Sequence, residues 1–142
     1  MMRVLLDTNV VLDLLLDRED FVEDALRSGM PMSGARSKRF IAPITPINIF
    51  FIARKLKGAE MAREYVSKML GTLQVCSLDQ QSLLAAEILP LKDYEDAVQV
   101  ACALFSHLDA IVTRDLKDFQ NSPVPVFSPP DFLLHLKLHR EE

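Results

Sequence analysis

Acidic side chains recur at the ends of predicted structural elements in this sequence. They follow the first and fourth apolar strands and open a late apolar helix: Asp7, Asp93, Asp96, Asp115 and Asp118. Carboxylates that are brought close together repel one another, and a hard divalent cation such as Mg²⁺ or Mn²⁺ removes that repulsion. The chemistry that this pattern first suggests is therefore the binding of a divalent metal.

Each acid also has an ordinary structural explanation. Asp7 could form a turn or cap the helix that follows it, and Asp93 with Asp96 has the spacing of an N-cap and an N3 residue. Asp118 could cap a short turn, and Asp115 could simply favour a loop. Capping does not, however, require acids after both the first and the fourth strand, so the joint pattern favours a shared site.

The elements that would position these acids alternate between strand and helix. Strands are predicted at 3–6, 40–42, 73–76 and 110–113, with a weak edge strand at 124–127. Helices are predicted at 9–16, 20–28, 45–57, 59–70, 79–89, 93–106 and from 128 onward. This alternation predicts an α/β fold in which a mostly parallel sheet of four to five strands carries helices on both faces.

Sites in such folds form at the carboxyl ends of the strands. The acids after the first and fourth strands would therefore meet in one crevice if those two strands are neighbours. The sequence leaves the order of the strands open.

Local signals predict several helix boundaries. Thr45 followed by Pro46 predicts an N-cap and a first helical residue. Gly58 and Gly71 predict two helix ends. In the first helix, Asp13 is expected on the polar side.

Length and composition bound the class of protein. The chain has 142 residues, of which 49% are hydrophobic and 25% charged, so a single globular domain spanning 1–142 is expected. The net charge of −4 argues against passive, non-specific binding to nucleic acid. The longest uncharged run, 40–53, is too short and too broken by proline to span a membrane.

The remaining compositional signals predict a cytoplasmic protein. No signal peptide is predicted, because Asp7 interrupts the first apolar segment too early. Cys76 and Cys102 lie in apolar stretches without metal-ligand spacing, so they are expected to be reduced core residues.

Three blocks of the sequence carry a resemblance to a known family. They are LLDTNVVLDLL at 5–15, DYEDAVQVACA at 93–103 and IVTRDLKDF at 111–119. In this order, on an alternating α/β pattern, they resemble the PIN-domain family of metal-dependent ribonucleases, which includes the VapC-type toxins of toxin–antitoxin pairs. The resemblance covers about residues 3–127 and implies a three-layer PIN-like fold with an acidic pocket at the carboxyl edge of the sheet.

The resemblance also implies roles for the acids. Asp7 would be the central ligand of one or two Mg²⁺ or Mn²⁺ ions, with Asp96 and Asp115 as the supporting catalytic ligands. Asp93 and Asp118 are flanking acids that could join them. A metal-bound water would then attack a phosphodiester bond of RNA.

Polar neighbours of the acids complete the predicted site. Thr8, Asn9 and Thr113 match positions that orient the metal ligands. Arg114 and Lys117 lie inside the last acidic block and are expected to contact substrate phosphates.

One position departs from the family's pattern. Many PIN domains carry a glutamate at the start of the third helix, and the matching residue here is Asn48. An asparagine can still offer a carbonyl oxygen to a metal or its water, but it lacks the negative charge. The missing charge predicts weakened metal binding and weak activity; Asn48 could equally be an ordinary N3 residue that pairs with Thr45.

These observations leave more than one function open. The leading hypothesis is a Mg²⁺- or Mn²⁺-dependent endoribonuclease, the toxin of a toxin–antitoxin pair, forming a homodimer and bound by a small antitoxin. The antitoxin would dock an amphipathic segment between helices, where part of the apolar run 49–52 could face it. The alternative is a degenerate, non-catalytic PIN-like module that binds RNA or protein. A phosphatase-like use of Asp7 as nucleophile is disfavoured, because Asn9 stands where a second aspartate would be needed.

Overall fold

The computed structural model describes residues 2–16 and 37–138. Within these ranges the chain forms five strands: β1 (Met2–Leu6), β2 (Ser37–Ile41), β3 (Gln74–Val75), β4 (Ala110–Val112) and β5 (Val126–Phe127). The same ranges hold six α-helices: α1 (Thr8–Leu16), α3 (Ile44–Lys57), α4 (Ala59–Thr72), α5 (Gln80–Ile88), α6 (Tyr94–Phe105) and α7 (Pro129–Leu138). A 3₁₀-helix, η1 (Leu116–Phe119), follows β4. The helix predicted at 20–28 lies outside the described residues.

The five strands form one sheet in the order β3-β2-β1-β4-β5, and every neighbouring pair is parallel. β1 is central and β4 is its direct neighbour, with Leu6 opposite Val112. The first and fourth strands are therefore neighbours, which the sequence alone could not establish. The residues that follow β1 and β4 leave the sheet at the same edge, one strand spacing apart.

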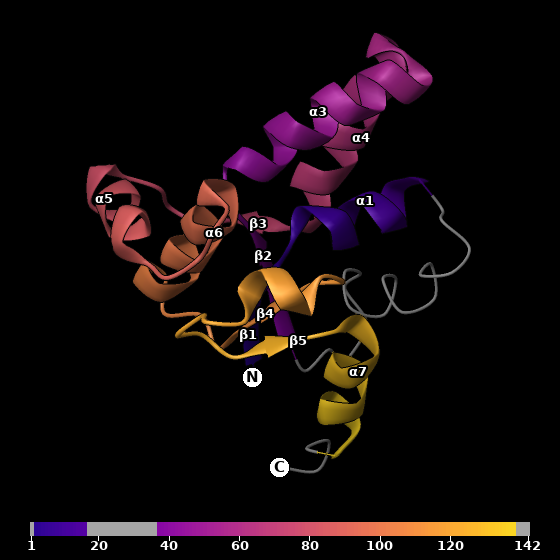
Figure 1. Cartoon of the computed structure of the whole chain (residues 1–142). Coiled ribbons are helices and arrows are strands. Elements are labelled where there is room, and N and C mark those ends of the chain that lie inside the picture. Colours follow the sequence, from indigo (N-terminus) through magenta and orange to yellow (C-terminus); the bar gives the residue numbers. More distant parts are fainter. Residues whose placement is uncertain (1, 17–36, 139–142) are drawn as a thin grey trace.

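Alternation along the strands builds two cores, one on each face of the sheet. In β1, Leu5 points to the face that α5 and α6 cover, whereas Val4 and Leu6 point to the opposite face. Buried side chains of α1, α3, α4 and α7 pack on that second face. Figure 1 shows the resulting three layers, with α5 and α6 on one side of the sheet and α1 and α7 on the other. The predicted α/β architecture is confirmed.

Two predicted helix boundaries are wrong. α3 begins at Ile44, so Thr45 lies inside the helix and is not its N-cap. Thr45 is fully buried, and its hydroxyl lies 3.1 Å from the hydroxyl of Thr8. Gly71 lies inside α4, which ends at Thr72. By contrast, Gly58 does end α3, with a φ of 93° that favours glycine.

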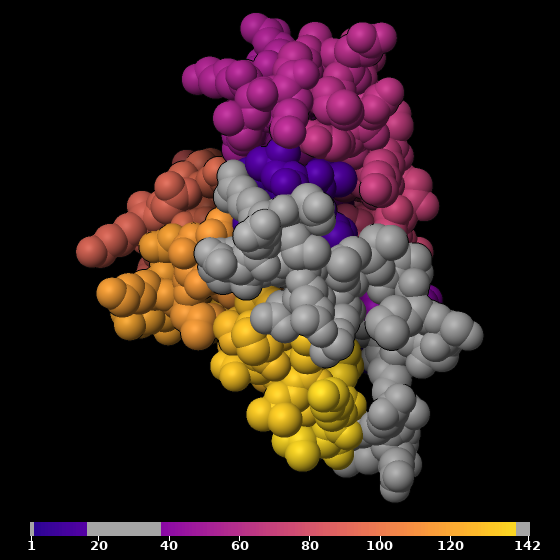
Figure 2. Space-filling model, turned by 90° about the vertical axis from the view of Figure 1, so that its right-hand side faces the viewer, coloured from indigo at the N-terminus to yellow at the C-terminus, as the bar shows by residue number. Residues whose placement is uncertain are grey.

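The helices α3 and α4 pack against each other and project from the body of the molecule (Figure 1). Figure 2 shows the same pair at the top of the molecule, with α7 at the opposite end. The apolar run 49–52 is split between two environments: Ile49 is fully buried, whereas Phe51 is 57% exposed. Ile47 and Leu56 are also exposed, so α3 presents an apolar surface beyond what the core requires.

The two cysteines are free and buried in the same core cluster. Burial raises the pKa of the Cys102 thiol to about 12, so it does not form a reactive thiolate at neutral pH. Among the helices of the described ranges, none is long and apolar enough to cross a membrane.

The C-terminal helix α7 packs on the core, and Phe132 is its largest buried side chain. Phe132 is fully buried, and its ring lies 6.1 Å from that of Phe127. We expect Phe132→Ala to lower the free energy of unfolding by about 3–5 kcal/mol, because it removes a buried ring and leaves a cavity. Urea denaturation measures this loss. Leu134→Ala on the same helix is the control, since Leu134 is 55% exposed and should change stability by less than about 0.5 kcal/mol. Equal losses in the two variants would contradict this packing.

Candidate functional site

Asp7 stands where β1 ends and α1 begins. Its backbone N–H donates to the carbonyl of Val112 (2.9 Å), which ties it to the end of β4. Its carboxylate is only 6% exposed and is held by three donors. Oδ1 accepts from the backbone N–H of Thr8 and from Nε2 of Gln99, both at 2.7 Å, and Oδ2 accepts from the Thr113 hydroxyl at 2.7 Å. The carboxylate therefore has one fixed orientation.

Burial raises the pKa of Asp7 above its ordinary value, and the nearby charge of Asp115 acts in the same direction. The three hydrogen bonds act in the opposite direction, because they stabilise the charged form. The structure thus keeps a carboxylate in a position that is unfavourable for a negative charge. A cation bound at Asp7 would offset that cost.

Asn9 and Thr113 connect Asp115 to Asp7. The side-chain amide of Asn9 donates to Oδ2 of Asp115 (2.9 Å), and its carbonyl oxygen accepts from the backbone N–H of Arg114 (3.3 Å). The Thr113 hydroxyl, which donates to Asp7, accepts from the backbone N–H of Asp115 (3.1 Å). The position of Asp115 is therefore coupled to that of Asp7 through neutral polar groups.

The first turn of α6 brings further acids to the same edge. Asp93 is the N-cap of α6, and its carboxylate accepts from the backbone N–H of Asp96 (3.1 Å), as predicted. Burial, followed by the charges of Asp7, Asp93, Asp118 and Glu95, raises the pKa of Asp96 to about 7. Asp7 after β1, the acids at the start of α6 and Asp118 of η1 are therefore close enough to repel one another.

Two residues of this site escaped the sequence reasoning, Glu95 and Gln99. Gln99 is fully buried, and besides its bond to Asp7 its Nε2 lies 3.5 Å from Oε1 of Glu95. Burial and the charges of Asp7 and Asp93 raise the pKa of Glu95. A signal was present in the sequence, because Gln99 is the single polar residue in the apolar stretch 97–104 and stands one helical turn after Glu95.

Arg114 does not stand in open solvent, as a surface phosphate contact would. Its Nε lies 2.9 Å from a carboxylate oxygen of Asp13, and Asp13 is only 1% exposed. The expectation that Asp13 lies on the polar side of its helix is therefore wrong. The ion pair joins α1 to the segment that carries Thr113 and Asp115, so it stabilises the site's framework.

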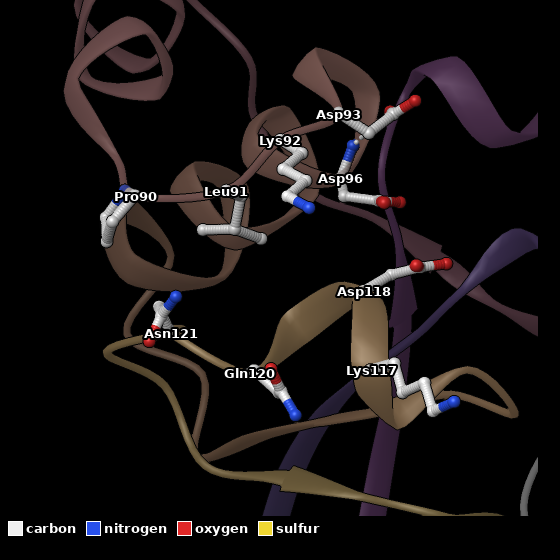
Figure 3. A pocket seen from close by; sticks show the side chains of 9 residues that line it. All are labelled: Pro90, Leu91, Lys92, Asp93, Asp96, Lys117, Asp118, Gln120 and Asn121. Atoms are coloured by element: carbon white, nitrogen blue, oxygen red, sulfur yellow. Dashed lines mark hydrogen bonds between the residues drawn. The ribbon is translucent and has the colours of Figure 1, made fainter.

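A pocket of about 330 Å³ opens beside the acids (Figure 3). Its lining comes from the segment before α6, from α6 itself and from η1 with the residues after it: Pro90, Leu91, Lys92, Asp93, Asp96, Lys117, Asp118, Gln120 and Asn121. Figure 3 shows the carboxylates of Asp96 and Asp118 on the same side of the pocket, with the Lys92 ammonium turned toward its interior. The acids thus border a cavity that also contains positive charge.

The chemistry of these side chains fits a hard divalent cation. The available metal-ligand atoms are carboxylate and amide oxygens. Burial, and after it the charges of neighbouring acids, raises the pKa values of Asp7, Asp96 and Glu95, and a bound cation would offset the cost of ionising them. In the described ranges, no group of three or more His, Cys, Asp and Glu side chains is arranged so that it could hold an ion as it stands. Binding would therefore require side-chain rotation of the exposed acids toward the fixed Asp7.

The comparison with protein families identifies the class to which this chain belongs. A model of the PIN domain matches residues 3–117, which include every acid of the site except Asp118. The chain is therefore a member of the PIN-domain family. A comparison with curated protein sequences finds no significant match.

Solved structures share the fold along most of the chain. VapBC2 from Rickettsia felis, bound to a promoter DNA fragment, superposes with a TM-score of 0.70 at 15% identity, covering 89% of this chain and 98% of that chain. A toxin–antitoxin complex from Klebsiella pneumoniae gives 0.66 at 25% identity, covering 89% and 97%. A sarcin–ricin-loop-cleaving VapC toxin from Mycobacterium tuberculosis gives 0.60 at 12% identity, covering 76% and 86%.

The electrostatics of Asp96 predict how the stability of the metal-free protein depends on pH. The pKa of Asp96 is about 7 in the folded protein, so the folded state binds this proton more tightly than the unfolded chain does. Stability should therefore fall as the pH rises from about 4 to 7, and the full penalty should remain at higher pH. We expect Asp96→Asn to raise the melting temperature in EDTA at pH 8 by about 3–5 °C, the equivalent of about 1 kcal/mol.

Thermal denaturation in EDTA at pH 5 and pH 8 measures this effect. Asp131→Asn, an exposed acid in the first turn of α7, is the matched control and should not raise the melting temperature, because a negative charge at a helix N-terminus is slightly stabilising. An Asp96→Asn protein that melts at or below the wild-type temperature at pH 8 would refute the repulsion.

The hydroxyl of Thr113 predicts a second stability effect. Thr113→Val removes a buried donor to a carboxylate, so we expect a loss of about 1.5–3 kcal/mol in urea denaturation at pH 8. Thr45→Val is the matched control, because it removes an equally buried hydroxyl whose partner, the hydroxyl of Thr8, carries no charge, and it should cost about 1 kcal/mol. Equal costs would mean that the Thr113 hydroxyl gives Asp7 no special support.

Proposed function

We propose that this protein is a metal-dependent endoribonuclease that hydrolyses phosphodiester bonds in RNA. The observation that carries the proposal is the buried, three-fold hydrogen-bonded carboxylate of Asp7, with acids from α6 and from the segment after β4 gathered around it. Membership of the PIN-domain family supports the same conclusion.

The acids would take different roles in binding the metal, according to how rigidly the structure holds each of them. Asp7 would be the central ligand of one or two Mg²⁺ or Mn²⁺ ions, with Asp96 and Asp115 as further ligands and Asp93 and Asp118 as flanking acids. A bound ion of this kind lowers the pKa of water and offsets negative charge on a phosphate. Fixed orientation of the central carboxylate reduces the reorganisation that binding requires.

Neutral side chains would keep the ligands in place during turnover. Gln99 and Thr113 hold the two oxygens of Asp7, and Asn9 holds one oxygen of Asp115. The hydroxyl of Thr8, 3.1 Å from that of Thr45, anchors the start of α1 to α3. Substitution of such orienting groups typically costs metal affinity or activity without removing a ligand.

The pocket beside the acids offers a path for the RNA strand. Lys117 and Lys92 line it, and their ammonium groups can contact phosphates on either side of the scissile bond. Arg114 would contribute to the field at the site from its ion pair with Asp13, rather than as a freely extended phosphate contact. The net charge of −4 does not prevent such contacts, because the two lysines lie at the pocket itself and bound divalent cations would offset the charge of the acids.

We further propose that the chain is the toxin of a toxin–antitoxin pair, acting in the cytoplasm as a homodimer. The similar structures from Rickettsia felis and Klebsiella pneumoniae are of toxin–antitoxin proteins, and the similar structure from Mycobacterium tuberculosis is of a toxin that cleaves the sarcin–ricin loop. The exposed apolar side chains on α3, Ile47, Phe51 and Leu56, could receive an amphipathic segment of a small antitoxin.

A cleavage assay tests the proposed activity. The purified protein is incubated with single-stranded and structured RNAs in Mn²⁺, Mg²⁺ or EDTA. We expect cleavage only with a metal, and we expect Asp7→Asn and Asp96→Asn to reduce the rate by more than about 100-fold, because even orienting residues typically cost 10–100-fold. Asp131→Asn, an exposed acid of α7 that does not belong to the acidic cluster, is the control and should cleave at the wild-type rate.

Cleavage that survives EDTA or either substitution would refute a metal nuclease. RNA or antitoxin binding without cleavage, in every metal and with every RNA, would instead identify a non-catalytic PIN-like module.

A further inference from the structure

The pocket beside the acids has two chemically different ends. Figure 3 shows the carboxylates of Asp96 and Asp118 at one end, and Leu91 and Asn121 on opposite sides of the other. The Lys92 ammonium lies between the two ends and is turned toward the interior. One end is therefore anionic, whereas the other combines an apolar wall with a side-chain amide. Neither Leu91 nor Asn121 has a role in the hydrolysis proposed above.

Both walls of this second end are anchored to the core. The backbone N–H of Leu91 donates to the carbonyl of Leu89 (2.8 Å), and the Leu91 side chain packs against the core cluster that contains the buried side of α6. On the opposite wall, Asn121 stands between Phe119 and Val124, which are only 2% and 4% exposed. A pocket whose walls are already fixed loses little conformational freedom when a ligand binds.

The polar groups that line this end can serve a ligand. In the part of the chain that the structure describes, no hydrogen bond or ion pair holds the side-chain amide of Asn121 or the ammonium of Lys92. An amide offers a donor and an acceptor side by side, which is the pattern that pairs with the edge of a nucleobase. Pro90 and Leu91 offer an apolar surface to the face of the same base.

The size of the pocket limits what can enter it. Its volume of about 330 Å³ is at the lower end of the range for ligand pockets, roughly 300–1,000 Å³. One nucleotide fits such a space, whereas a base pair does not. Sequence-specific binding of RNA also depends on unpaired bases, whose edges are free to form hydrogen bonds with a protein.

We propose that this end of the pocket recognises one unpaired nucleotide of the RNA, next to the phosphate that is cleaved. The inference rests on the proposed function and deepens it, because it names residues that would read the RNA sequence. The amide of Asn121 would hydrogen-bond the edge of the base, and Leu91 would contact its face. Lys92 would contact the adjoining phosphate, which fixes the register of the strand without reading its sequence. Asn121 is then a specificity-determining residue.

The experiment uses a pool of single-stranded RNA that contains a randomised stretch. The full-length protein cleaves the pool in Mn²⁺, and sequencing of the cut ends gives the base preference at each position around the cut. In parallel, RNA that binds the protein in Ca²⁺ is recovered uncut and sequenced, so that one readout does not depend on cleavage. The variants are Asn121→Ala, Asn121→Asp and Lys92→Ala, with Gln81→Ala, an exposed amide of α5, as the matched control.

We expect the wild type and Gln81→Ala to prefer the same base at one position beside the cut. Asn121→Ala should lower that preference by about 5-fold or more, because one amide–base pair supplies discrimination of this size. Asn121→Asp should change which base is preferred, because a carboxylate only accepts hydrogen bonds. Lys92→Ala should weaken the binding of all sequences alike and reduce the salt dependence of binding by about one phosphate contact.

The outcomes separate this inference from the proposed function. Cleavage in Mn²⁺ with the same base preference in Asn121→Ala as in Gln81→Ala would overturn the recognition site and leave the nuclease standing. A wild type that cuts or binds every sequence equally would overturn it as well. An Asn121-dependent preference among bound RNAs, without cleavage in any metal, would support the recognition site and refute the nuclease. If the wild type neither binds nor cleaves RNA, both proposals fail.

Discussion

The burial of one carboxylate at the end of the central strand governs this structure. Asp7 is almost inaccessible to solvent, yet it is placed where its charge is costly, so the surrounding residues must satisfy both of its oxygens. The three donors come from the start of α1, the middle of α6 and the end of β4. These three elements can only meet at Asp7 if β4 lies beside β1 and α6 crosses the same edge.

The rest of the site alternates acids with neutral polar groups. Gln99 lies between Asp7 and Glu95, and Asn9 contacts Asp115. Each amide or hydroxyl donates to a carboxylate and adds no charge, so the acids can be brought close together at a reduced electrostatic cost. Burial, and after it the remaining repulsion from the neighbouring acids, raises the pKa of Asp96. Stability given up in this way is typical of sites that are completed by a ligand.

The acidic edge of the sheet is distinct from a second surface, the exposed apolar face of α3. The α3–α4 pair projects from the body and exposes apolar side chains, whereas its inner residues, such as Ile49 and Thr45, anchor it to the sheet and to α1 (Figures 1 and 2). α3 therefore contributes to both parts: Thr45 in its first turn contacts Thr8 beside Asp7, and its outer face remains exposed. A partner bound on that face would contact the same helix that anchors the start of α1.

Much of the architecture could be predicted from the sequence because it is encoded locally. Alternating apolar runs, the N-cap Asp93 and the helix end at Gly58 act over a few residues, and the structure places elements where these signals predict them. The concentration of acids at strand ends was equally readable, since it needs only the order of residues along the chain.

Tertiary structure decided which of these residues meet. The neighbouring positions of β1 and β4, the pairing of Asp13 with Arg114 and the contact of Thr45 with Thr8 join segments that are 37 to about 100 residues apart. The local pattern singles out Gln99 as a polar residue in an apolar stretch, but only the crossing of α6 over the sheet edge brings Gln99, and Glu95 beside it, to Asp7. The sequence by itself therefore determined that an acidic site exists at the carboxyl edge of the sheet. Long-range packing decided which residues form that site, because the role of a carboxylate depends on the charges and hydrogen-bond donors that the fold brings to it.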